Sequence, residues 1–393
     1  MLDPESFDQD MASAAYMWPA ELHSQFSTPQ YPLVVDSGLS TSQLPQFARS
    51  SQPVLSNIDS LPNMSPPLHI EDQVDSVGHY PHEKGSTIPD PLSYSEHGRT
   101  FQAYKQHKYD LPNDAVEQDR LDLGHSLWRM VMNDTLHWAP VDKPSRVLDI
   151  GTGTGIWAIE FAELNPQAKV IGTDLSLIQP DMNGQLPNLE FIREDVEEEW
   201  TLEGPFDFVH LRLMFTCFND HRSVMRKAYD SLRPGGWIEY QDSEVDYDSD
   251  DYSHRGTALH KWNFLIKAGA AARGRDIEVS RKYKEYLMQI GFVDVVEKKI
   301  KVPGNPWPAG RRRKEMGEIA EVISTEAVQA MSPKMLGDEG LGMSPDAVQQ
   351  IVSLVQGNIH DQKIHITWPF YVVCGRKPFP DEVGQHPVVN RED

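Results

Sequence analysis

The stretch that decides the fold is RVLDIGTGTGIWA, residues 146–158. Its first half holds the short apolar run 147–150, which is typical of a parallel strand covered on both faces. Glycines follow at alternate positions and allow a tight turn with close approach of the backbone to a ligand. The helix expected over 156–163 directs its free N–H groups at this loop, which suits a carboxylate or a phosphate. The stretch therefore predicts a strand, a nucleotide-binding loop and a helix.

The spacing of the glycines separates two classes of ligand. A dinucleotide fold requires G-x-G-x-x-G, whose third glycine would fall at Ile156. Here the order is G-x-G-x-G, with the acid Asp149 inside the preceding strand, so the NAD fingerprint fails. An acid before G-x-G-x-G instead resembles the S-adenosylmethionine (SAM) loop of class I methyltransferases. The resemblance implies that the acid faces the ammonium group of SAM and that the turn packs against its amino-acid part.

Two further strands carry acids at their ends. The apolar run 169–174 ends in Asp174, 19 residues beyond Gly155. A carboxylate about 20 residues after the loop meets ribose hydroxyls in βαβ units, so Asp174 is expected to accept from both hydroxyls. The strand expected over 189–193 runs into Asp195, where the resemblance to methyltransferases places an acid, or its neighbouring amide, against the adenine amino group.

The chain then continues the alternation of strands and helices. We expect a strand over 206–212, a helix over 223–232 and a strand over 237–240. The turn LRPGGWIE between the last two is typical of class I methyltransferases, because Gly235 and Gly236 would end the helix in a left-handed cap. The sequence therefore predicts an α/β, Rossmann-like class I methyltransferase fold: a doubly wound, mostly parallel seven-stranded sheet with an antiparallel last strand and helical lid insertions.

Segments on both sides extend this order. A helix is expected over 114–132 before the loop, because apolar residues recur there at helical spacing. The acidic segment 245–253 is expected to be a solvated loop rather than a metal site. Beyond it, the patterns predict helices over 257–272 and 283–290, a strand over 293–302, a helical insertion at about 305–360 with helices near 319–330 and 345–355, and a last strand over 364–373.

The composition changes near residue 94. Residues 1–93 are rich in Ser, Pro and Gln without periodicity, and such a segment cannot bury enough apolar surface to offset the entropy of ordering. We therefore expect a disordered N-terminal arm over 1–93, a methyltransferase domain over 94–378 and a flexible C-terminal tail over 379–393.

Charge and cysteine content exclude several classes. The formal net charge of −23 opposes binding to phosphate backbones, so no nucleic-acid partner is expected. Two cysteines, Cys217 and Cys374, form neither a zinc cage nor a disulfide framework, and no metal site is predicted. No window approaches the 18 or so apolar residues of a membrane span. A cytoplasmic protein without a membrane partner is expected, with a nuclear location as the alternative.

Several motifs resemble one fungal family. HGRTFQAYK (97–105), LPNDAVEQDRLDLGHSLW (111–128), LIQP (177–180) and NPW (305–307), together with the SAM loop, are similar to the LaeA-like methyltransferases, which are regulators and enzymes of secondary metabolism. The likeness spans about 94–378. It implies SAM as cofactor, and it implies that the segment around Tyr104 and the helix near Arg120 close over it. The cofactor-binding residues it implies are Asp149, Gly151, Gly153, Gly155, Asp174 and Asp195.

Methyl transfer from SAM is an in-line displacement, so the protein mainly aligns the acceptor and the methyl group in a dry pocket. His210, near the end of the fourth strand, is the predicted catalytic residue. The hypothesis is that it orients or deprotonates the acceptor, with Arg212 as an anion partner. The alternative is that His210 is a hydrogen-bonded wall residue of the pocket.

Three functional classes stay open. The first is an enzyme that methylates an O or N of a small-molecule acceptor in fungal secondary-metabolite biosynthesis, with the segment after Val245 and the insertion as a lid. The second is a LaeA-type nuclear regulator that methylates protein or itself and binds protein partners through its N-terminal arm. For that class the basic run 311–314 is either an import signal or a solvated surface. The third is a catalytically silent SAM-binding interaction protein.

Overall fold

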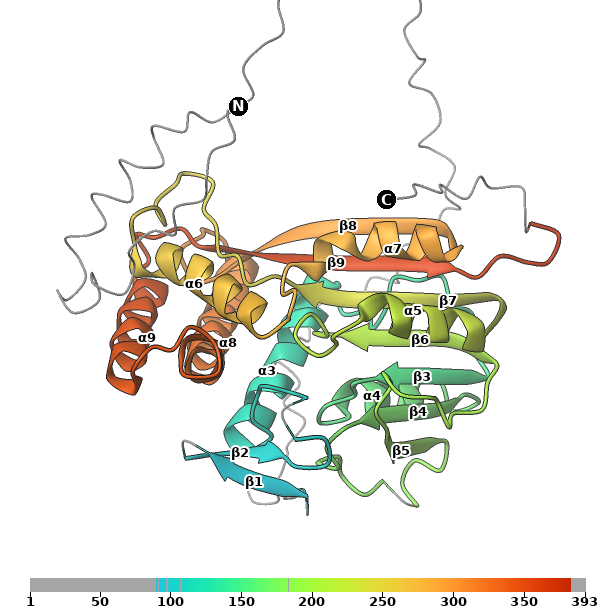
Figure 1. Ribbon diagram of the computed structural model, residues 1–393. Helices are drawn as coiled ribbons and strands as arrows, with labels where there is room; N and C mark the ends of the chain where they lie inside the picture. Colours follow the sequence, from blue (N-terminus) through green and yellow to red (C-terminus); the bar gives the residue numbers. More distant parts are fainter. Residues whose placement is uncertain (1–89, 91, 97, 107, 183, 383–393) are drawn as a thin grey trace, which may run out of the picture. The chain divides into compact units, whose positions relative to one another are not determined.

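The computed structural model describes residues 90, 92–96, 98–106, 108–182 and 184–382. Most of the arm predicted over 1–93 and of the tail predicted over 379–393 lies outside the described residues, so both stay predictions. The described part of the chain is built around one large sheet with helices on both faces (Figure 1).

The large sheet has the strand order β5-β4-β3-β6-β7-β9-β8. Its parallel strands are β3 (Arg146–Ile150), β4 (Lys169–Asp174), β5 (Leu189–Arg193), β6 (Phe206–Arg212) and β7 (Leu232–Ser243). The last strand, β9 (Thr367–Arg376), is antiparallel to both of its neighbours, β7 and β8 (Val293–Pro303). The predicted seven-stranded, doubly wound sheet is thereby confirmed. The strand order reverses at β3, and ligands of such sheets bind at the carboxyl ends of the strands beside this point.

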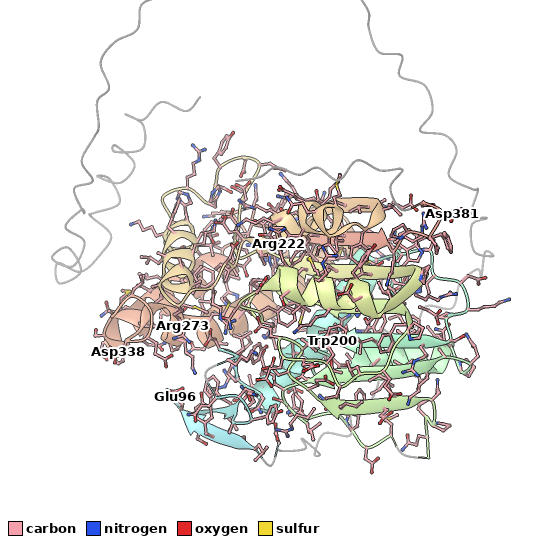
Figure 2. The ribbon with its side chains drawn as sticks, turned by 45° about the vertical axis from the view of Figure 1, so that its right-hand side comes forward. Glu96, Trp200, Arg222, Arg273, Asp338 and Asp381 are labelled. Carbon is pink, nitrogen blue, oxygen red and sulfur yellow. The ribbon has the colours of Figure 1, made fainter. Side chains whose placement is uncertain are left out.

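A group of helices lies beyond the carboxyl ends of the parallel strands (Figure 1). It consists of α6 (Ala258–Ala272), α8 (Arg311–Leu336) and α9 (Pro345–His360), which pack on one another, with α8 also packing on α3 (Ala115–Val131). Arg273, labelled in Figure 2, caps the C-terminal end of α6. The hairpin of β1 (Ser93–Glu96) and β2 (Arg99–Gln102) lies on the same side. None of the residues of α6, α8 and α9 lines the cavity described below, so a lid role for the insertion stays a prediction.

The first helix of the predicted insertion, expected near 319–330, begins earlier and ends later than expected. Helix α8 starts at Arg311, so the basic run 311–314 forms its first turn, where Arg312 donates a hydrogen bond to the carbonyl oxygen of Met130. Among the helices that the structure describes, none is long and apolar enough to cross a membrane.

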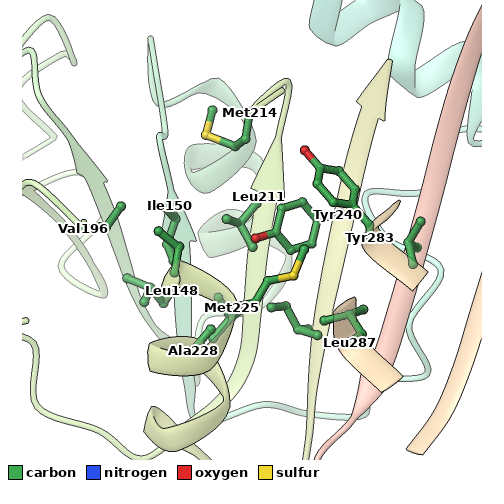
Figure 3. Close-up of a cluster of buried hydrophobic side chains, with 14 of the residues drawn as sticks. Leu148, Ile150, Val196, Leu211, Met214, Met225, Ala228, Tyr240, Tyr283 and Leu287 are labelled. Carbon is green, nitrogen blue, oxygen red and sulfur yellow. The ribbon is translucent and has the colours of Figure 1, made fainter. Parts of the chain in front are cut away.

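Two apolar cores hold the helices to the sheet. On one face, α5 (His221–Ser231) and α7 (Tyr283–Ile290) cover a cluster that Figure 3 shows, with a short 3₁₀ helix, η2 (Val279–Lys282), before α7. Its members include Leu148, Ile150, Leu211, Tyr240 and Leu287. On the other face, α4 (Ile156–Leu164) packs Trp157 and Phe161 against Val147 and Phe208. Successive side chains of β3 and β6 point to opposite faces of the sheet, so each strand contributes residues to both cores.

Two local predictions are wrong. The Gly-Gly pair does not cap α5, because the helix ends at Ser231 and Leu232 is already extended, with φ −76° and ψ 145°. Leu232 pairs with Phe206 of β6, so the chain enters the sheet before Gly235, whose φ is +80°.

The acidic segment 245–253 is also only half solvated. Val245, Tyr247 and Ser249 are buried, while Asp248 and Asp250 are exposed. The reason is that the segment continues past β7 beside the start of β9, where Asp248 bridges to Thr367, so alternate side chains face the protein.

Candidate active site

A cavity lies at the carboxyl ends of β3, β4 and β6, where the strand order reverses. Six of the seven predicted site residues line it, and the seventh, Gly155, follows directly in the loop. The six are Asp149, Gly151, Gly153, Asp174, Asp195 and His210. The structure therefore brings the predicted residues to one place.

The loop needs glycine for two reasons. Gly151, Gly153 and Gly155 have φ values of +67°, +59° and +83°, a region that side-chain-bearing residues rarely adopt. In addition, a Cβ on Gly155 would lie 2.5 Å from the Phe191 ring, and one on Gly151 would lie 2.5 Å from the Met214 thioether. Helix α4 begins directly after Gly155, which supplies no capping side chain. Its first N–H groups are thus available to a ligand at the loop.

Asp174 is held against this loop at the end of β4. Its Oδ2 accepts a hydrogen bond from the N–H of Gly153 at 2.9 Å, and its Oδ1 accepts one from the N–H of Ser176 at 2.9 Å. Burial raises the pKa of Asp174 to about 6, against the opposing effect of these amides. Each carboxylate oxygen can accept more than one hydrogen bond, so Asp174 keeps capacity for ligand hydroxyls.

Asp149 is paired with His210 on the neighbouring strand. Oδ1 of Asp149 lies 2.7 Å from Nδ1 of His210, and Oδ2 accepts from the Thr152 hydroxyl at 2.6 Å. The His210 side chain is fully buried, and its ring stacks on Trp157 with centroids 3.7 Å apart. Burial lowers the pKa of His210, although Asp149 opposes this. The arrangement suits a residue that orients Asp149, and a catalytic role for His210 stays a prediction.

A second polar group lies beside His210 and was missed by the sequence reasoning. Glu239 of β7 pairs in register with His210 and accepts hydrogen bonds from the N–H groups of Trp138 and Ala139. Gln241 donates to Glu239 at 2.8 Å. Burial raises the pKa of Glu239 to about 7. The available signal was a pair of polar residues, Glu239 and Gln241, at alternate positions and hence on one face of the strand.

Residues 108–113, which we call the strap, cover one side of the cavity. Four of them line it: Lys108, Tyr109, Pro112 and Asn113. Lys108 forms ion pairs with Asp195 and, at 3.3 Å, with Glu197, while Asp110 pairs with Arg273 at 2.5 Å. The strap is thereby tied both to the sheet and to α6.

The predicted covering segments are displaced by a few residues. Tyr104 is 40% exposed and lies outside the cavity lining, against the guanidinium of Arg193. Arg120 pairs with Glu117 and does not line the cavity, whereas Leu121 does. The strap was missed because its residues have no periodic pattern.

Asp195 and Arg212 complete the polar lining. Asp195 is buried, pairs with Lys108 and accepts a hydrogen bond from the N–H of Glu197 at 3.0 Å. Arg212 is partly buried, and one of its nitrogens, Nη1, lies 3.0 Å from Nδ1 of His125. Burial lowers the pKa of Arg212 to about 10.

Comparison with known proteins identifies the family. The protein family described as "Methyltransferase domain" matches residues 126–297. Methyltransferase pytC of Aspergillus terreus is 34% identical over 287 residues, which cover 72% of this chain and 88% of pytC. The secondary metabolism regulator LAE1 of Cochliobolus heterostrophus is 32% identical over 73% of this chain and 95% of LAE1. The regulator laeA of Aspergillus fumigatus is 31% identical over 72% of this chain and 77% of laeA.

These relatives match most of their own length as well as most of this chain, over 287 residues for pytC, so the likeness extends beyond the 126–297 segment matched by the family. The family uses SAM as its cofactor and transfers its methyl group. The chain belongs to the fungal LaeA-like class I SAM-dependent methyltransferases.

Proposed function

We propose that this enzyme methylates an oxygen or nitrogen of a small-molecule acceptor in fungal secondary metabolism. The observation that carries the proposal is the strap. Through Lys108 and Asp110 it is joined to the sheet and to α6, so it closes one side of the cavity. A covered cavity suits a small acceptor better than a protein side chain presented on a surface.

We infer that the predicted residues hold the cofactor, because the cavity fits its parts. The glycine loop allows close approach of the backbone, Asp174 can accept from ribose hydroxyls, and Asp195 stands at the end of β5 for the adenine. Asp149 stands beside the loop for the ammonium group. When bound, SAM supplies a methyl group on a positively charged sulfur.

The remaining lining supports transfer in a dry site. Next to Arg212, the end of β6 and the turn after it bring four apolar or weakly polar side chains to the cavity: Leu213, Met214, Cys217 and Phe218. Such a wall excludes water from the acceptor and the methyl group and strengthens electrostatic contacts with them. We infer that His210 acts by holding Asp149, and that deprotonation of the acceptor by His210 is the alternative.

The test is a comparison of metabolites by mass spectrometry. A strain lacking the gene should lose one compound and accumulate a species lighter by one methylene unit. A strain carrying Asp174→Ala should reproduce this profile, because the variant removes the ribose contact. Restoration of the wild-type profile by Asp174→Ala would instead contradict a methyltransferase role, because the compound would then form without cofactor binding by this chain.

A second candidate is a regulatory role, with methylation of protein or of the chain itself. It is favoured by the relatives LAE1 and laeA, whose names are those of secondary metabolism regulators. For a regulator, deletion would lower the products of several unrelated pathways together rather than shift one compound by a methyl group. The same metabolite comparison therefore separates the two functions.

A further inference from the structure

Arg212 is a cation in the cavity that forms no ion pair with any acid the structure describes. It is the last residue of β6, and it lines the cavity. Among the residues that the structure describes, no carboxylate oxygen lies within ion-pair distance of its guanidinium. By contrast Arg120 pairs with Glu117, and Arg273 pairs with Asp110. A guanidinium removed from bulk water without a counter-charge is costly, so its position calls for an anionic ligand.

The hydrogen-bond partner that the structure describes for Arg212 does not supply the charge. Nη1 of Arg212 lies 3.0 Å from Nδ1 of His125. Burial lowers the pKa of His125 to about 4, so the imidazole is neutral near pH 7. With Nδ1 as acceptor, its proton lies on Nε2, which faces Glu160 at 3.1 Å. His125 therefore orients the guanidinium without supplying a directly paired negative charge.

The surroundings of Arg212 match one chemical group. Arg212 lies two residues after His210 on β6, so the two side chains are on the same face of the strand. His210 contacts Asp149 from that face. The carboxylates of Asp149, Glu160 and Asp122 lie within electrostatic range of Arg212, but none of them forms an ion pair with it. Asp149 and Asp122 are the two at the glycine loop. Asp122 accepts from the hydroxyl of Thr154, in the glycine loop, at 2.6 Å. A cation beside two acids at this loop is the complement of an α-amino acid zwitterion.

We propose that Arg212 binds the α-carboxylate of the cofactor's amino-acid part, with His125 as its positioning residue. The planar guanidinium can hold a carboxylate through two parallel hydrogen bonds. Asp149 then faces the ammonium group of the same zwitterion. This inference rests on the proposed placement of SAM at the glycine loop. An acceptor carboxylate is the other source of the same chemistry, and the experiment separates the two.

The test is calorimetric binding to purified full-length protein, with two nucleosides as probes. S-adenosylhomocysteine carries the amino-acid part, whereas 5′-methylthioadenosine lacks it. Arg212→Met should weaken binding of S-adenosylhomocysteine by about 30-fold and leave binding of methylthioadenosine within about 2-fold. Arg129→Met is the matched control, because Arg129 pairs with Glu160 in the same polar group but does not line the cavity. It should leave both affinities unchanged.

Two results overturn the proposal. Unchanged binding of S-adenosylhomocysteine to Arg212→Met would assign Arg212 to the acceptor, and an equal loss for both nucleosides would mean that Arg212 only shapes the cavity. If the variant does not fold, the wild type decides: equal affinity for S-adenosylhomocysteine and its decarboxylated analogue refutes the carboxylate contact. Failure of the wild type to bind any of these nucleosides would instead refute the placement of the cofactor.

Discussion

The imidazole of His210 and the carboxylate of Asp149 meet across two neighbouring strands, with 2.7 Å between Nδ1 and Oδ1. The two residues are paired in register between β6 and β3, so the backbone of the sheet sets their separation. Stacking of the His210 ring on Trp157 fixes its rotation. The direction of the Asp149 carboxylate therefore depends on a side chain that is itself immobilised on two sides.

This relationship separates a positioning role from a basic one. In His210→Asn, the amide nitrogen can replace Nδ1 as donor to Asp149, whereas His210→Leu has no donor. We expect Asn to keep the affinity for S-adenosylhomocysteine within about 3-fold and Leu to weaken it by about 10-fold. If His210 is the base, both variants keep this affinity and lose about 10²–10⁴ in turnover, with a changed pH profile. Calorimetry and turnover measurements decide between them.

Asp174 should make cofactor binding pH-dependent. Burial raises its pKa from 3.8 to about 6 in the folded protein. The carboxyl group is neutral below that pH and anionic above it, and ribose hydroxyls donate more strongly to the anion. Affinity for S-adenosylhomocysteine should therefore increase as pH rises through about 6. Asp174→Asn should bind more weakly and without this dependence, while Asp134→Asn, at an exposed position outside the cavity lining, should behave as wild type.

The raised pKa of Asp174 affects protein stability in the opposite direction to cofactor affinity. Because the folded pKa lies above the unfolded one, the contribution of Asp174 to stability is fully present below about pH 4 and is lost as pH rises through about 6. Urea titrations of wild type and Asp174→Asn across this range should converge at low pH. A difference that grows toward low pH would contradict the assignment.

The glycine loop predicts a difference between two alanine substitutions. Gly155 and Gly256 both have positive φ values, +83° and +74°. Only at Gly155 would a Cβ collide with a neighbour, the Phe191 ring at 2.5 Å, whereas Gly256 has no atom within 4 Å. Gly256→Ala should cost about 1 kcal/mol of unfolding free energy and Gly155→Ala about 3 kcal/mol. Equal losses in urea denaturation would show that the backbone conformation alone matters.

Glu239 should matter for stability, although it does not line the cavity. Glu239→Leu leaves the buried N–H groups of Trp138 and Ala139 without their acceptor, so we expect a loss of about 3 kcal/mol. Glu190→Leu is the control, because Glu190 lies on strand β5, is about half exposed and pairs with a half-exposed Lys169. It should change the unfolding free energy by less than about 0.5 kcal/mol.

The sheet was largely predictable because its signals are local. Three predicted strands, 169–174, 189–193 and 206–212, have the bounds observed, and the strand predicted from the apolar run 147–150 begins one residue earlier, because these runs are delimited by glycines, acids and polar turns. The helix 283–290 is likewise observed as predicted, because Gly291 ends it in the left-handed conformation. The prediction was wrong where strand pairing overrode the local sequence signal. The Gly-Gly pair indicated a helix cap, but Leu232 instead pairs with β6.

The candidate site was predictable only in part. Its glycines and acids follow strands at characteristic spacings, so Asp149 and Asp174 could be named from sequence. The strap could not, because Lys108 meets Asp195 from 87 residues away in sequence and within a segment of no regular structure. Arg212 was predicted as an anion partner from its charge and its place after His210. That it forms no ion pair could not be predicted, because this depends on where the surrounding acids lie in the folded chain.

The strap has a kinetic consequence. One short segment contacts Asp195, at the end expected to hold adenine, and also Arg273, the C-cap residue of α6. We therefore expect binding of the nucleoside and binding of the acceptor to be coupled. The molecule that binds first sets the position of the strap, and the second must bind to that arrangement. Product inhibition by S-adenosylhomocysteine should accordingly be competitive with SAM and noncompetitive with the acceptor, the pattern of a compulsory order in which the nucleoside arrives first and departs last.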